Sequence, residues 1–381
     1  MAIVTSFPDD PGAPVGGVEA VSANLVQALV KFDDLRIDVI TTKRSYSSSR
    51  TDRWAKVAIH RLRWAGGSTL RNAIGPGRRQ MQRYLSDLKP DVIHAHDTYG
   101  LMIKGMAAPR VFTIHGFIHA DLRVSSGRFA VLRSLIWRRI ETSGWADQPH
   151  IISISPYVRE GLRGITKGVI HDIDNPICES FFDIHRKERK GAIFSAAVIT
   201  PRKNTLALVD AVAELAANGL DVELRLAGSL DDERYVQQVR DRIQQKGLEK
   251  RVFLLGRIDT NQIRDELSCA NVFALASLEE NSPMGIEEAM AAGVPVVTSN
   301  RCGMPYMIRD GESGFLVDPN HPDDIARRLG QLVENDALRR SMGAKGKEIA
   351  LDRFHPAKVV ARTREVYLRA IQDFRHKMTT K

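Results

Sequence analysis

The stretch SLEENSPMGIEEAMAAGVPVV, residues 277–297, decides the fold. The apolar run at 272–275 precedes it and is typical of a short buried strand. A polar loop follows, and a helix is expected to begin at Met284 or Gly285. The apolar run at 294–298 then predicts the next strand. Strand, loop, helix and strand in this order indicate a parallel sheet covered by helices.

The helix predicted at Met284 leaves its first N–H groups without partners in the helix, which makes its start a binding site for phosphate. Glu280 and Glu288 flank that start, and a fully helical span would separate them by about 12 Å. Such a pair is too far apart for glycoside hydrolysis. It suits two carboxylates that bind hydroxyls at opposite ends of an extended ligand, with a diphosphate between them; the plain alternative is an acidic helix start. We interpret Glu287 in that plain way, as an acidic residue favoured by the helix dipole.

Strand and helix patterns alternate on both sides of this stretch. The charged run at 185–190 interrupts them and is expected to be a linker. We therefore predict an α/β fold with two doubly wound, Rossmann-like domains at 1–185 and 186–356, and a helix at 357–374 that packs back on the first. Ligands of such folds bind at the carboxyl ends of the strands, here facing a cleft between the halves. The strands predicted elsewhere are residues 2–6, 37–41, 91–95, 110–114, 151–154, 192–198, 222–227 and 252–255.

Composition and length fit a chain with two cores. The 381 residues are 43% hydrophobic and 27% charged, as in ordinary globular proteins. No run approaches the ~20 apolar residues of a membrane span, and the N-terminus lacks the pattern of a signal peptide. The three cysteines are far apart and lack metal-ligand spacing, which predicts free thiols in a cytoplasmic protein.

The net charge of +9 is concentrated in one region. Residues 43–89 hold twelve basic and two acidic side chains, so the rest of the chain is nearly neutral. Such a region favours an anionic partner, namely phosphate-rich lipid, nucleic acid or a phosphorylated substrate. A solvated basic face without a partner is the alternative.

Seven motifs in order resemble the retaining glycosyltransferases of family 4, which have the GT-B fold. The most specific is Glu280-x7-Glu288 with the following string AMAAGVPVV at 289–297. Singly, the other motifs are weak, but at these spacings the set is strong. They are Gly16-Gly17-Val18-Glu19, DVIHAH at 91–96, TIHG at 113–116, Pro201-Arg202-Lys203, VFLLG at 252–256 and GESGFLV at 311–317.

The resemblance implies transfer of a sugar from a nucleotide-diphosphate sugar to a glycan or lipid-linked acceptor, without a metal or cofactor. It implies that Lys203, assisted by Arg202, and the helix start stabilise the leaving diphosphate, that Glu288 holds the ribose, and that Glu280 and His115 contact the donor sugar. The candidate catalytic residues are thus His115, Lys203 and Glu280, and the candidate donor-binding residues are Gly16, Gly17, Arg202, Lys203, Gly256, Arg257, Ser282, Pro283, Met284, Gly285 and Glu288.

Plainer alternatives exist for several of these residues. Gly16 and Gly17 could form a simple tight turn, Lys203 could be a solvated loop lysine, and His115 a structural histidine. His94, His96 and His119 are expected to be structural or on the acceptor side. Spacing would permit a metal cluster of His94, His96 and His115, but we do not expect a metal site there.

Three positions depart from the family pattern. Val198 stands where many members carry an arginine, which removes one expected contact to the diphosphate. Pro283 lacks an N–H, so one phosphate donor is absent. Asn175-Pro176-Ile177 replaces the usual Pro-Asn-Gly turn. These changes affect the expected sugar and donor affinity more than the reaction class.

Two rival functions stay open on the sequence. One is another GT-B activity, a nucleotide-sugar epimerase or a phosphorylase. The other is a basic binding protein on a degenerate fold, although no interleaved aromatics support nucleic-acid binding, which we do not expect. The segment 128–140 is amphipathic, with Phe129, Leu132, Ile136 and Ile140 at helical spacing among arginines that include Arg128. It is either a core helix or a peripheral anchor on the inner face of an anionic cytoplasmic membrane.

Overall fold

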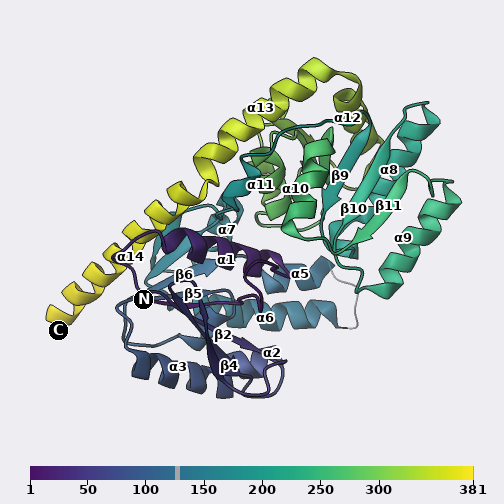
Figure 1. Ribbon diagram of the computed structural model, residues 1–381. Coiled ribbons are helices and arrows are strands. Elements are labelled where there is room, and N and C mark those ends of the chain that lie inside the picture. The colour runs from purple at the N-terminus through teal and green to yellow at the C-terminus, as the bar shows by residue number, and fades with distance from the viewer. Residues whose placement is uncertain (125–128, 381) are drawn as a thin grey trace. The chain divides into compact units, whose positions relative to one another are not determined.

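A computed structural model describes residues 1–124 and 129–380 (Figure 1). Contacts divide the chain into two compact units, which we describe separately. Unit 1 contains residues 1–119, 132–176 and 356–381, and unit 2 contains residues 120–131 and 177–355. The chain thus passes into the second unit at Ile177, somewhat before the charged run at 185–190. That run is held to unit 2 by backbone hydrogen bonds from Lys187 to Ser268 and from Arg189 to Cys269.

Unit 1 is built on one sheet with the strand order β3-β4-β2-β1-β5-β6-β7-β8 among its described residues. All neighbours are parallel except β3 and β4, which form an antiparallel hairpin at the edge. The central strands are buried along their length, as both faces are covered. The strands are β1 (Ala2–Val4), β2 (Asp38–Lys43), β3 (Arg50–Trp54), β4 (Val57–Arg63), β5 (Ile93–His96), β6 (Arg110–Ile114), β7 (His150–Ser153) and β8 (Val169–Asp172).

The helices of unit 1 include one from the far end of the sequence. Val359, Val366 and Tyr367 of α14 (Pro356–Thr379) share a core with β1, β2 and α1 (Gly17–Leu29). The Tyr367 hydroxyl lies 2.8 Å from Nδ1 of His94 on β5, which ties the C-terminal helix to the sheet. The remaining helices are α2 (Thr69–Ile74), α3 (Pro76–Leu88), α4 (Tyr99–Met102), α5 (Ile118–Val124), α6 (Ala130–Trp145) and α7 (Pro156–Gly161), although contacts assign parts of α5 and α6 to unit 2.

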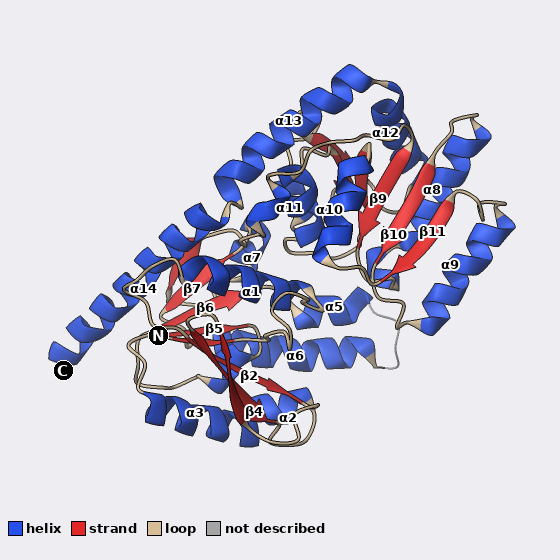
Figure 2. Cartoon of the chain, in the orientation of Figure 1, coloured by secondary structure: helices blue, strands red, loops and turns tan. Residues whose placement is uncertain are grey.

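Unit 2 has a fully parallel sheet with the order β11-β10-β9-β12-β13-β14. Figure 2 shows helices on both faces of it, and a separate hydrophobic core fills each interface. One core includes α8, α9 and α12, and the other includes α10 and α11. The elements are β9 (Ala192–Ala196), α8 (Thr205–Ala217), β10 (Glu223–Ala227), α9 (Glu233–Gln245), β11 (Val252–Gly256), α10 (Thr260–Cys269), β12 (Val272–Leu275), α11 (Met284–Ala291), β13 (Val296–Ser299), β14 (Gly314–Val317), α12 (Pro322–Glu334) and α13 (Asp336–Arg353).

The predicted α/β class with two Rossmann-like, doubly wound sheets is therefore confirmed. The β3–β4 hairpin was not anticipated. β3 reads RTDRW and is largely exposed, so it lacks the apolar run that marks a buried strand.

Candidate active site

Apart from Gly16 and Gly17, the predicted donor-binding residues belong to unit 2, where they lie at one edge of its sheet. Arg202 and Lys203 follow β9, Gly256 ends β11, and the loop that begins after β12 carries Glu280. Because the strands are parallel, their carboxyl ends open on the same edge. The fold thereby gathers residues that are about eighty positions apart in sequence, as the contact between Arg202 and Glu280 shows.

The start of α11 is an uncapped helix N-terminus. Its first residue is Met284, one of the two starts that the sequence predicted, and Pro283 before it provides no side-chain cap. A Cβ on Gly285 would lie 2.9 Å from Cζ of Phe273 and 3.0 Å from the carbonyl oxygen of Ala196. Only glycine therefore lets the helix start lie directly against the end of β9. The uncapped N–H groups are suited to bind an anion there.

An ion cluster joins the loops after β9 and β12. The Glu280 carboxylate accepts hydrogen bonds from Nζ of Lys203 and, at 2.7 Å, from an Nη of Arg202. Arg202 also donates to the backbone oxygen of Glu279 at 2.7 Å, and its own carbonyl accepts from the Leu278 amide. Burial lowers the pKa of the Lys203 ammonium, and the Glu280 carboxylate opposes that shift. Arg202 also lies 3.7 Å from the Asp121 carboxylate, so the cluster combines two cations with two carboxylates. A phosphate that displaced Glu280 would take over its contacts with the two cations.

Glu288 lies one turn into α11 and differs from Glu280 in its surroundings. Burial raises the pKa of its carboxyl to about 8, and no ion pair of Glu288 is found in the described part of the chain. A partly buried acid without a salt-bridge partner is ready to accept hydrogen bonds from ligand hydroxyls.

Glu287 has a more specific place than the interpretation from the sequence gave it. It is fully buried, and its Oε1 accepts a hydrogen bond of 2.7 Å from the Ser282 hydroxyl. The interaction fixes the loop directly before the helix start. The interpretation of Glu287 as an acid favoured by the helix dipole was therefore incomplete. Sequence spacing does not show which of two adjacent glutamates points inward.

The ends of β10 and β11 form a second part of this edge. Gly256 has a φ of +69° and its carbonyl accepts from the Gly228 amide at 2.8 Å. A Cβ on Gly228 would lie 1.9 Å from the carbonyl oxygen of Ala197, so this glycine is required, and the sequence analysis missed it. The Arg257 side chain pairs with Asp231 at 2.9 Å.

Gly16 and Gly17 lie at the start of α1 in unit 1. Gly16 is its N-cap residue in an extended conformation, and a Cβ on either glycine would meet nothing within 4 Å. The protein itself therefore does not require glycine at these positions. A ligand that approaches the backbone is one reason for the absence of side chains there.

Three histidines cluster at the ends of β5 and β6. Nε2 of His115 lies 2.8 Å from Nδ1 of His96, and the His115 amide donates to the Asp97 carboxylate at 2.8 Å. His94 is bonded to Tyr367 and, through Nε2, to Thr113 at 2.7 Å, which makes it structural. Burial lowers the pKa of all three imidazoles. Across residues 1–124 and 129–380, no group of three or more potential ligands is arranged to hold a metal ion.

Comparisons with known proteins identify the two halves. Residues 15–180 match a family model described as Glycosyltransferase Family 4, and residues 178–349 match one described as Glycosyl transferases group 1. Together they span most of the chain. The chain is a glycosyltransferase, with a family 4 match over its first half and a group 1 match over its second.

Relatives and solved structures agree with this assignment. An uncharacterized glycosyltransferase of Methanocaldococcus jannaschii is 24% identical over 93% of this chain and 94% of its own length. A phosphatidyl-myo-inositol mannosyltransferase of Mycolicibacterium smegmatis is 26% identical over 79% of this chain and 77% of its own. Sucrose-phosphate synthase of Thermosynechococcus elongatus superposes with a TM-score of 0.81 at 20% identity, covering 100% of this chain and 99% of its own. Anabaena HepE in complex with UDP and glucose gives 0.71 at 16% identity, covering 96% and 98%.

These likenesses support the GT-B fold and glycosyl transfer over the epimerase, phosphorylase and binding-protein alternatives. The roles of individual site residues in this glycosyltransferase stay predictions.

Proposed function

We propose that this glycosyltransferase moves a hexose from a nucleoside-diphosphate sugar to an acceptor with retention of configuration and without a metal. The observation that carries the proposal is the ion cluster of Lys203, Arg202 and Glu280 at the strand edge where α11 begins. The cations and the helix N–H groups provide the positive field that a leaving diphosphate requires.

In the proposed mechanism, Lys203 moves from Glu280 to the diphosphate when the donor binds. Glu280 is then free to bind a hydroxyl of the donor sugar, which His115 also contacts by family resemblance. The glycosidic C–O bond breaks with its electron pair going to the phosphate oxygen. The acceptor oxygen forms the new bond from the same face, and its proton passes to the departing phosphate. No protein nucleophile is required.

The rest of the donor is proposed to bind along the same edge. Glu288 accepts hydrogen bonds from the ribose hydroxyls, and the backbone at Gly256 and Arg257 contacts the base. Because HepE has been solved with UDP and with UDP-glucose, uridine nucleotides are the first to test.

The experiment is to incubate the protein with a panel of UDP-, GDP- and ADP-hexoses, with and without EDTA, and to record the product by NMR. We expect nucleotide release that an acceptor accelerates, an unchanged rate in EDTA, and an anomeric configuration equal to that of the donor. Loss of turnover in EDTA would contradict metal independence, and an inverted product would contradict retention.

We further propose that the acceptor is lipid-linked and that α6 docks on an anionic membrane surface. Phe129, Val131, Leu132, Leu135 and Ile136 are all exposed large apolar side chains in and next to this helix. Exposed arginines accompany them, and the only acid of α6, Glu141, is buried. Arg128 of the predicted anchor lies outside the described residues. Apolar side chains flanked by cations are what an anionic bilayer surface binds.

Part of the basic region does not support this docking. Arg61 is buried and Lys43 is paired with acids, so neither can face lipid, whereas Arg63 and Arg71 are exposed. No helix among the described residues is long and apolar enough to cross a bilayer.

Co-sedimentation with anionic and neutral liposomes at rising salt tests the docking. We expect salt-sensitive binding to anionic vesicles that Leu132→Ser with Ile136→Ser abolishes. The matched control is Leu368→Ser, which changes an equally exposed leucine on α14. Equal binding to neutral vesicles, or equal loss in the control, would exclude α6 as the docking surface and favour a soluble acceptor.

A further inference from the structure

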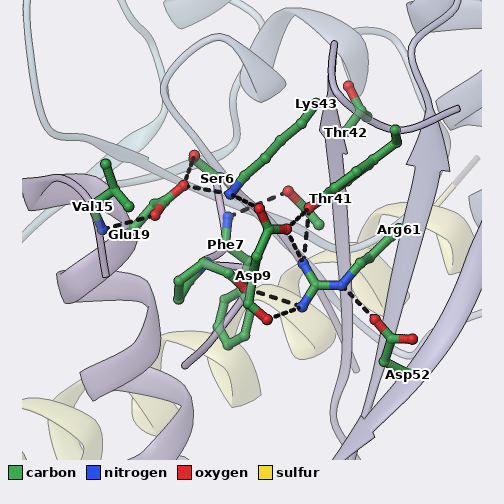
Figure 3. A network of polar contacts seen from close by, with 12 residues as sticks. Ser6, Phe7, Asp9, Val15, Glu19, Thr41, Thr42, Lys43, Asp52 and Arg61 are labelled. Atoms are coloured by element: carbon green, nitrogen blue, oxygen red, sulfur yellow. Dashed lines mark hydrogen bonds and ion pairs between the residues drawn. The ribbon is translucent and has the colours of Figure 1, made fainter. Parts of the chain in front are cut away.

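Arg61 of β4 is one of the largest fully buried side chains in the protein, with 2% of its surface exposed. Its guanidinium donates through Nε to Asp52 at 2.6 Å and through Nη1 to the Tyr46 hydroxyl at 2.8 Å. A buried arginine is costly unless its donors are satisfied. Figure 3 shows that the remaining bonds all go to a single segment, the loop after β1.

That loop, residues 5–16, leads to Gly16 and Gly17. Arg61 donates to the backbone oxygens of Pro8 at 3.1 Å and Asp9 at 3.0 Å, and to the Asp9 carboxylate at 3.2 Å. Tyr46 reinforces this contact, because its hydroxyl accepts from Arg61 and donates to Asp9 at 2.8 Å. Burial and the bond to Asp9 raise the pKa of Tyr46 to about 12, so the phenol keeps its proton.

The other end of the loop is held by Glu19 in the first turn of α1. Its Oε2 accepts from the Val15 amide at 3.1 Å, directly before Gly16. Lys43 at the end of β2 lies 2.9 Å from Oε1 of Glu19 and 3.4 Å from Oδ2 of Asp9. Lys43 thus bridges a carboxylate of the loop and a carboxylate of the helix that follows it, as Figure 3 shows.

A need to neutralise the Asp9 carboxylate does not explain why Arg61 is buried beside it. The Asp9 side chain is 60% exposed and could be hydrated without a buried partner. Two of the Arg61 bonds are to main-chain carbonyls, and their effect is to fix the backbone path of a loop that contains Pro8, Pro11 and Pro14. A guanidinium is suited to this because its planar fork donates to several oxygens in one fixed geometry.

We propose that Arg61 is a positioning residue, which together with Lys43 fixes the loop so that the Gly16 and Gly17 backbone is preorganised for the ligand. The ligand part of this inference rests on the proposed function, in which these glycines contact the nucleotide sugar or acceptor. Arg61 and Lys43 bond to the loop and to the first turn of α1, so their effect is on the geometry of the loop.

Hydrogen exchange of the peptide 5–17 tests the anchor in the purified protein without any ligand. We expect Arg61→Met to accelerate exchange of the Phe7 and Val15 amides, which are bonded to Thr41 and Glu19, by about ten-fold or more. Arg61→Lys, which keeps the charge and loses the fork, should give an intermediate rate.

Arg110→Met is the matched control. Arg110 is also buried in this sheet and bonds to Asp147 at 2.6 Å and to the carbonyls of Ile103 and Asp147, but it lies at the amino end of β6, away from the glycines. It should lower stability without altering exchange in peptide 5–17. Equal acceleration in both variants would overturn the proposal, because global loosening would then explain the result.

If Arg61→Met does not fold, Lys43→Met removes the second tie from a less buried position and should accelerate exchange at Val15 more than at control amides of β7. Unchanged exchange there would overturn the proposal as well.

Steady-state kinetics of the same variants separates the loop anchor from the proposed ligand role of Gly16 and Gly17. Faster loop exchange with a lowered kcat/KM supports both, and faster exchange with unchanged turnover upholds the anchor and contradicts the role of the glycines.

Discussion

The carboxyl edges of the two sheets both carry a lysine and an arginine, but these side chains differ in what they contact. In unit 2, Lys203 and Arg202 meet the Glu280 carboxylate in the loop before an uncapped helix, and Arg202 also donates to the Glu279 carbonyl. In unit 1, Arg61 and Lys43 hold the carbonyls and carboxylates of a loop, and Arg61 is almost completely buried. Lys203 and Arg202 can exchange a carboxylate for a ligand phosphate. If Arg61 left its partners in the same way, the geometry of the loop would be lost. Whether a basic side chain at a strand edge binds a ligand or holds a loop therefore has to be inferred from its contacts.

Of the substitutions that test this comparison, Lys203→Ala should have the largest effect on kcat/KM. Loss of one charge-stabilising contact in a closed site costs about 3 kcal/mol, so we expect kcat/KM to fall roughly 100-fold. Val198 stands where many members of the family carry an arginine, so one cation that could compensate is absent. Steady-state kinetics with the preferred donor measures this, and Lys246→Ala at an exposed site is the control. Near-normal turnover would place the diphosphate elsewhere.

Glu288→Ala should weaken binding of the free nucleoside diphosphate by about 1–3 kcal/mol, the size of a lost hydrogen bond to a charged group. Calorimetry on the folded variant measures the change. Glu249→Ala, at an exposed position of the same unit, should leave affinity unaltered. An equal affinity in the Glu288 variant would refute the ribose contact.

The raised pKa of Glu288, about 8, predicts a pH dependence of the same binding step. If the ribose binds the carboxylate, binding releases a proton below this pKa. Affinity should therefore rise with pH from 6.5 to 8.5, by roughly ten-fold or more, and level off above that range. Because the nucleotide phosphate titrates too, the comparison is with Glu288→Gln, which should lack this component. Parallel profiles for the two proteins would contradict the assignment.

Arg257→Ala should have the smallest effect. Its guanidinium is exposed and directed at Asp231, so only its backbone is available for the base. Nucleotide affinity should change by less than about two-fold. A larger loss would show that the side chain, rather than the backbone, contacts the ligand.

The sequence predicted the elements whose signals are local. The start of α11 at Met284 follows from the change from polar loop to Ala-rich helix, and the buried parallel strands follow from their apolar runs. Lys203 and Glu280 were both selected as site residues, and the structure brings their side chains together. Their direct contact required the fold, because they are far apart in the chain.

What the sequence missed depends on long-range contacts. Arg61 was counted as one of twelve basic residues in a region of concentrated charge, yet it is buried, and three of its hydrogen bonds go to a loop more than fifty positions earlier. The contact of Glu287 with Ser282 depends on the direction in which its side chain leaves the helix, which the sequence does not show. Gly228 is required by the neighbouring strand end at Ala197, which no local pattern reveals.

A crystal structure of the protein with the nucleoside diphosphate of its preferred donor tests the central claim most directly. The account predicts phosphate oxygens within hydrogen-bond distance of Nζ of Lys203 and of the Gly285 amide, with the ribose hydroxyls on Glu288 and the Lys203–Glu280 ion pair opened. Phosphates bound away from the start of α11, with that ion pair intact, would contradict it.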